Sequence, residues 1–137
     1  MTVKLEQLSA PHPYEAGREF DYEGFRITVR PWRNRDFKQT LARIIAERNI
    51  DPNEIDEKLD RELSQEAASE TILVGWSDVV DGDGEAVPYT PELGLQAFRG
   101  NEEFYDDLVV MSVALRRSRF KALERDSGNS DESSGTS

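Results

Sequence analysis

The chain has 137 residues, of which 28 are acidic and 17 are basic, so its formal net charge is -11. It has no cysteine and a single histidine, His12. This excludes a disulfide scaffold, a thiolate zinc site and a cysteine nucleophile. The strongly apolar run at residues 72–74 is far shorter than the roughly 20 residues that span a bilayer. The chain also lacks an apolar signal core at its start, so we expect a single cytosolic domain with no membrane partner.

Residues 1–19 contain Pro11 and Pro13 around His12, and we expect them to be irregular, with a short strand possible at Val3 to Leu5. Apolar residues then alternate with polar ones along Phe25, Ile27 and Val29, after Phe20 and Tyr22 have alternated in the same way. This period of two predicts a β-hairpin over residues 20–29 that turns at Glu23-Gly24.

The period changes to that of a helix after Trp32. Asn34 or Asp36 opens a predicted helix whose apolar stripe is Phe37, Leu41, Ile44 and Ile45, and Asn49 is its expected stop. Asp51-Pro52-Asn53-Glu54 is a second start signal, which predicts a long helix over residues 52–76 with an acidic outer face.

The remaining elements are marked by turn and cap residues. Asp81-Gly82-Asp83-Gly84 is the strongest turn signal of the chain. Thr90-Pro91-Glu92 predicts the start of a short helix that ends at Gly100, and Asn101 caps a last helix with an apolar stripe. The members of that stripe are Phe104, Leu108, Met111 and Leu115.

These patterns predict an α+β fold that is mainly α-helical, with an N-terminal β-hairpin followed by about four helices. We divide the chain into an irregular segment (residues 1–19), one globular domain (residues 20–123) and a disordered acidic tail (residues 124–137). The tail reads ERDSGNSDESSGTS and contains no apolar residue whose burial would offset the entropy of ordering.

Two charged patterns can each be interpreted either as an ordinary charged surface or as a binding site. Residues 36–90 contain 14 acidic and five basic side chains, which indicates either a solvated face or a docking surface for a basic partner. Four arginines lie close to Trp32, namely Arg26, Arg30, Arg33 and Arg35. Because the rest of the chain is acidic, we expect these arginines to pair with the acidic middle helix and predict no nucleic-acid partner.

No pattern indicates catalysis, and we expect the protein not to be an enzyme and to hold no cofactor or metal. Asp81, Asp83, Glu85 and Glu92 have the spacing of a calcium loop, but Ala86 stands where that loop requires glycine. The acidic pairs of the middle helix lack a neighbouring basic or apolar pocket that would separate their pKa values. Phosphate-binding and serine-nucleophile motifs are absent from the sequence.

Residues 71–91, TILVGWSDVVDGDGEAVPYTP, carry a resemblance to a known family. An apolar run is followed by Gly75-Trp76, an acidic turn at Asp83-Gly84-Glu85, Val87-Pro88-Tyr89 and Thr90-Pro91-Glu92. This order resembles tail assembly chaperones of long, non-contractile-tailed bacteriophages (siphophages), and the likeness extends in outline over residues 20–123.

The resemblance implies a protein that is made in the host cell cytoplasm during infection and is absent from the mature virion. It implies two partners, the tape measure protein and the tail tube protein, and it leaves a homo-oligomer open. The alternative is a small structural or adaptor protein of the phage tail or head-tail junction.

Four aromatic residues are the predicted contacts with such a partner. Trp76 and Tyr89 flank the acidic turn, and Phe104 and Tyr105 begin the last helix. Aromatic side chains at these positions supply a large contact area. Burial in the core is the open alternative, and it is stronger for Trp76 and Phe104 than for Tyr89 and Tyr105.

Overall fold

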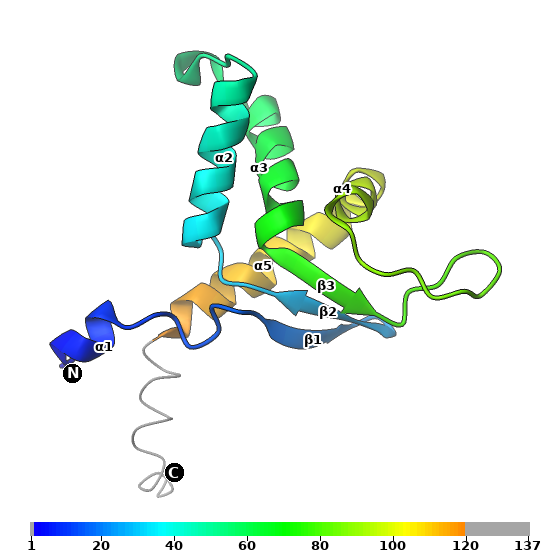
Figure 1. Cartoon of the computed structure of the whole chain (residues 1–137), viewed down its shortest axis with the longest axis horizontal. Helices are drawn as coiled ribbons and strands as arrows, with labels where there is room; N and C mark the ends of the chain where they lie inside the picture. The colour runs from blue at the N-terminus through cyan, green and yellow to red at the C-terminus, as the bar shows by residue number, and fades with distance from the viewer. Residues whose placement is uncertain (1, 120–137) are drawn as a thin grey trace, which may run out of the picture.

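The computed structural model describes residues 2–119, in which three strands are interspersed with helices (Figure 1). The elements are α1 (Leu5–Ser9), β1 (Arg18–Tyr22), β2 (Phe25–Val29), α2 (Arg35–Glu47), the 3₁₀ turn η1 (Pro52–Glu54), α3 (Glu57–Thr71), β3 (Leu73–Ser77), α4 (Pro91–Gly100) and α5 (Glu102–Arg117). The predicted fold class, α+β and mainly helical, is confirmed. The predicted tail, residues 124–137, lies outside the described residues.

The three strands form one antiparallel sheet in the order β1-β2-β3. Phe20 pairs with Ile27, and Ile27 pairs with Trp76. Residues that pair directly across a sheet point to the same side, so these three side chains share one face. Ile27 and Val29 are fully buried on that face.

The helices pack on the sheet and on one another. Figure 1 shows α2 and α3 as a pair that rises from the sheet, while α5 runs along the strands. The backbone N–H of Trp32, just beyond β2, donates to the Ser112 carbonyl of α5 at 3.1 Å. The core between these elements is contributed by nearly every element from β2 to α5, and its largest fully buried side chains include Phe37, Phe98, Leu63 and Leu108.

Side-chain caps fix where the helices begin. The Asn34 side chain accepts from the Phe37 N–H at 2.9 Å, Thr90 from Leu93 at 3.2 Å, and Asn101 from Phe104 at 3.1 Å. Each of these bonds satisfies a backbone donor of the first helical turn. The predicted starts of α2, α4 and α5 are therefore confirmed, as is the hairpin turn at Glu23-Gly24.

The predicted long helix over residues 52–76 is wrong at both ends. Its start signal forms only η1, because Asp51 caps a single 3₁₀ turn. Ile55 is extended, and the helix proper begins after Asp56, whose carboxylate accepts from the Leu59 N–H at 2.8 Å. Two acidic caps five residues apart therefore compete, and the second one starts α3.

The C-terminal part of that predicted helix is β3. Ile72 is the C-cap residue of α3 and still has a helical backbone, whereas the β-branched Val74 suits the extended chain that follows. Gly75 packs beside the Thr28 side chain of β2, where a Cβ would lie 3.6 Å from the Thr28 hydroxyl oxygen. The expected two-stranded hairpin is therefore a three-stranded sheet.

The N-terminal segment also differs from the prediction. The short strand expected at Val3 to Leu5 is wrong, because α1 begins at Leu5, and the segment is therefore not irregular throughout. The Gln7 side chain accepts from the Lys4 N–H at 3.0 Å, and the Ser9 hydroxyl donates to the Leu5 carbonyl at 2.9 Å. These local bonds favour a helical turn.

Candidate functional site: an apolar groove at the hairpin end of the sheet

A groove of about 490 Å³ opens where the β1–β2 hairpin turns, beside the end of β3 and the junction of α4 and α5. Its lining is mostly apolar, with Glu23 and Asp78 as its two acidic members. The remaining lining residues are Tyr22, Phe25, Trp76, Val79, Ala97, Gly100, Asn101 and Phe104. A concave apolar surface with a few polar groups is the usual form of a binding site.

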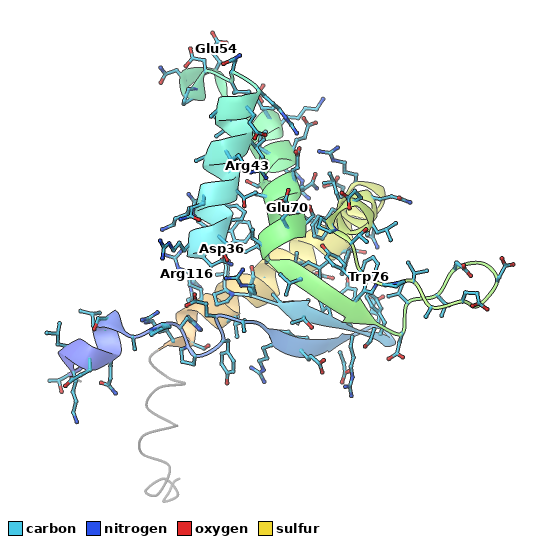
Figure 2. All side chains as sticks on the ribbon, in the orientation of Figure 1. Asp36, Arg43, Glu54, Glu70, Trp76 and Arg116 are labelled. Carbon is cyan, nitrogen blue, oxygen red and sulfur yellow. The ribbon has the colours of Figure 1, made fainter. Side chains whose placement is uncertain are left out.

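Trp76 forms one wall of the groove (Figure 2). Its indole N–H donates to the Val87 carbonyl at 2.7 Å, and its ring meets the Tyr89 ring edge-on with centroids 4.8 Å apart. The indole is therefore held from behind by the chain that follows the acidic loop, and it remains half-buried.

Three aromatic rings form the opposite side. Phe104 lies 5.2 Å from Tyr22 and 6.1 Å from Phe25, measured between ring centroids. The Tyr22 hydroxyl donates to the Asp107 carboxylate at 2.6 Å, and this bond to an anion raises the pKa of Tyr22. The hydrogen bond also fixes the hairpin against α5, so the groove is preformed by packing.

The structure separates the four aromatic residues that the sequence predicted as partner contacts. Trp76 and Phe104 line the groove, although Phe104 is only 4% exposed and forms its floor. Tyr89 stands behind Trp76, and its hydroxyl donates to the Ser69 carbonyl. Burial raises the pKa of Tyr89. Tyr89 therefore supports the groove wall and does not line the groove.

Tyr105 lies away from the groove. It is 3% exposed, its ring centroid is 5.0 Å from that of Phe98, and the Arg61 guanidinium lies 5.0 Å above its ring. Burial raises the pKa of Tyr105 to about 12. Tyr105 is a core residue in this structure and does not line the groove.

Sequence reasoning missed four apolar members of the groove, namely Tyr22, Phe25, Val79 and Ala97. The alternation along residues 20–29 already indicated two aromatic side chains on the buried face of the hairpin. No local signal places that hairpin beside the α4–α5 junction, because this neighbourhood depends on the pairing of β2 with β3.

The acidic loop after β3 is held by its own backbone. Val80 and Ala86 form an isolated bridge, and the Asp81 carboxylate accepts from the Asp83 and Glu85 N–H groups at 2.8 and 3.0 Å. That carboxylate is therefore used by the turn itself. Within residues 2–119, no group of three or more His, Asp or Glu side chains is placed to hold a metal ion.

The arginines around Trp32 divide into two groups. Arg26 pairs with Glu19 at 3.5 Å and Asp21 at 3.3 Å of the adjacent strand, and Arg30 pairs with Asp36 of α2 at 2.9 Å. These two arginines are neutralised within the fold, whereas Arg33 and Arg35 make no ion pair with any residue from 2 to 119.

The fold and groove define a small acidic α+β protein with an apolar groove on its surface. A family model described as YdaY prophage protein matches residues 32–129, which is most of the chain. The chain belongs to this family and is phage-derived. No curated protein and no solved structure matches it. Of its helices within residues 2–119, none has the length and apolar character needed to cross a bilayer.

Proposed function

We propose that this protein is a tail assembly chaperone that binds the tape measure protein through the apolar groove and performs no catalysis. The observation that carries the proposal is the groove itself, which presents aromatic surface on a protein of net charge -11. An amphipathic helix recognises such a groove through apolar residues spaced by three or four. A long helical protein offers many such stretches.

The acidic surface supports the same role. A protein that covers sticky segments must bind apolar surface and still keep the complex in solution, and a high net charge does this by repulsion between complexes. Residues 36–90 carry most of that charge, while the groove concentrates apolar area at one end of the sheet. The two requirements are thus met by different parts of one chain.

The resemblance of residues 71–91 to siphophage tail assembly chaperones gives the proposal its partner. This segment supplies Trp76 and Val79 to the groove and Tyr89 to its support. By the same resemblance we propose that the protein acts in the host cell cytoplasm, brings tail tube protein to the tape measure protein, and is absent from the mature virion.

The test is co-expression with the tape measure protein encoded by the same prophage. We expect the wild-type chain to raise the soluble fraction of that protein and to be captured with it. If the tape measure protein is equally insoluble with and without this chain, and no complex is recovered, the chaperone proposal fails.

Two adjacent valines provide a matched pair that tests the groove. Val79 lines the groove, whereas Val80 is 57% exposed and does not line it. Val79→Glu places a charge in the apolar groove and should abolish the gain in solubility, while Val80→Glu adds the same charge beside it and should preserve the gain. Equal activity of the two variants, both confirmed as folded by circular dichroism, would reject the groove as the binding surface.

Mass spectrometry of purified particles distinguishes this proposal from the adaptor alternative. A chaperone that leaves before the particle is complete should be missing from the virion. Detection of this chain in a fixed number of copies per particle would favour a structural or adaptor protein.

A further inference from the structure

Two basic stretches that lie about 80 residues apart in the sequence meet at the end of the molecule opposite the groove. Arg33 and Arg35 precede and begin α2, and Arg116 lies in the last turn of α5. Figure 2 shows Arg116 near Asp36 at the base of α2, far from Trp76. Arg33, Arg35 and Arg116 line a pocket of about 220 Å³. The other lining residues are Pro11, His12, Glu15, Pro31, Trp32, Asn34 and Arg119.

Three arginines of this pocket have no anionic partner among the described residues. Within residues 2–119, neither Arg33, Arg35 nor Arg116 lies within ion-pair distance of a carboxylate, although five other arginines do. Arg119 is engaged differently, because its guanidinium donates to the Leu8 and Ala10 carbonyls. The fold therefore tolerates a local excess of positive charge in an otherwise acidic protein.

The other charged groups of the pocket do not cancel this excess. Among residues 2–119, Glu15 is the single carboxylate that lines the pocket. His12 adds no charge at neutral pH, since burial lowers its pKa below the ordinary value of 6.5. The C-terminal end of α5 adds partial negative charge, which Arg116 and Arg117 offset.

We propose that this arginine pocket binds a carboxylate-rich segment of a partner protein. The planar fork of arginine matches a carboxylate with two parallel hydrogen bonds, and arginines from two elements can hold successive carboxylates of one peptide. The acidic surface of the rest of the chain does not prevent this, because at physiological salt it is screened beyond about 8 Å.

The surroundings favour an acidic peptide over a nucleic acid. A nucleic-acid site needs a continuous basic track with aromatic rings free for stacking. Here the arginines line one small pocket, and the Trp32 ring is packed on Phe37 with centroids 5.0 Å apart. The inference stands independently of the proposed chaperone function, since it uses neither the groove nor the tape measure protein.

The test uses the full chain and a fluorescein-labelled hexaglutamate peptide, with binding followed by fluorescence anisotropy. We expect saturable binding that the double variant Arg35→Gln, Arg116→Gln weakens by roughly tenfold or more. The double variant Arg43→Gln, Arg48→Gln is the matched control, because both arginines lie outside the pocket and pair with glutamates of the fold. It removes the same two charges and should leave the affinity within about twofold.

A second probe, an oligothymidylate of equal negative charge, separates the two ligand classes. We expect it to bind more weakly than hexaglutamate. Absence of hexaglutamate binding, equal binding by the double variant and the control, or tighter binding of the oligonucleotide would each overturn the proposal. Thermal melting of every variant confirms that the loss of binding is not loss of fold.

Discussion

The two ends of α5 carry surfaces of opposite kinds. At its N-terminal end, the groove is made of rings such as Phe104 that are also part of the core. At its C-terminal end, the arginine pocket is made largely of exposed side chains such as Arg35 and Arg116. Binding and stability are therefore inseparable at the groove, whereas the charges of the arginine pocket can be changed with little effect on the fold.

The largest expected effect is at the floor of the groove. Phe104→Ala removes a ring that packs against Tyr22, Phe25 and Phe98, with centroids 5.2 to 6.1 Å away. We expect a loss of about 3–5 kcal/mol in the free energy of unfolding, because the cavity forms where several elements meet. Urea denaturation measures this change. A loss below about 1 kcal/mol would show that the groove floor is not part of the core.

A pair of glycines in α4 tests how tightly the groove wall is supported. At Gly94 a Cβ would lie 2.8 Å from the Tyr89 Cζ and still closer to the hydroxyl, whereas at Gly100 nothing lies within 4 Å. Alanine ordinarily stabilises a helix by about 0.5–1 kcal/mol relative to glycine. The steric clash should reverse this sign for Gly94→Ala, at a net cost of about 1–2 kcal/mol.

Thermal melting of the two variants provides the comparison. Gly94→Ala should melt below the wild type, and Gly100→Ala should melt at the same temperature or above it. If Gly94→Ala melts as high as Gly100→Ala, then Tyr89 moves aside without cost, and its contact with Trp76 does not hold the wall.

The arginine end contains one group whose protonation affects stability. The His12 Nε2–H donates to the Leu115 carbonyl at 3.0 Å, and its Nδ1 accepts from the Tyr14 N–H at 3.0 Å. Both bonds are made by the neutral ring, and a proton on Nδ1 would break the second. Burial of the ring lowers the pKa of His12 in the folded state below 6.5.

The sign of the resulting pH dependence follows from proton uptake. As the pH falls below the ordinary histidine pKa of 6.5, the unfolded chain gains a proton before the folded chain does, so stability is lost. Urea denaturation between pH 7.5 and about pH 5 measures this trend. His12→Gln should flatten this part of the curve, and an unchanged slope would contradict the assignment of the neutral ring.

The elements that were predicted correctly from sequence are those with local signals. Asn34 and Thr90 cap their helices through side-chain bonds within three residues, and Glu23-Gly24 turns the hairpin within two. By contrast, Leu73–Ser77 becomes a strand because β2 offers it a pairing edge. An apolar run with Gly75 inside it fits the end of a helix or a strand, and only that tertiary pairing distinguishes the two.

The candidate binding surfaces could be predicted less well from the sequence, for the same reason. Trp76 and Phe104 were identified by residue type, but the groove that joins them requires β3 in its correct place. Tyr105 was predicted as a partner contact because it stands at the start of the last helix, yet it packs on Phe98. The arginine pocket depends on the Trp32–Ser112 backbone bond, which joins two distant stretches.

The smallest expected effect on stability is the loss of Arg116, which we compare with the loss of Arg30 at the same end of the molecule. Arg30 has a side chain only 14% exposed, pairs with Asp36 at 2.9 Å and donates to the Glu15 carbonyl at 2.6 Å. Arg30→Ala should cost about 1–2 kcal/mol, because a mostly buried side chain loses its packing as well as these two hydrogen bonds. Arg116→Gln removes an exposed charge with no ion pair within residues 2–119 and should change the free energy of unfolding by less than about 0.5 kcal/mol. Adding salt should not widen the difference in unfolding free energy between the two variants, since screening acts mainly on exposed charges.

If Arg116→Gln destabilises the protein as much as Arg30→Ala does, then the pocket arginines are structural. The two ends of α5 would then not differ in the way that their burial indicates.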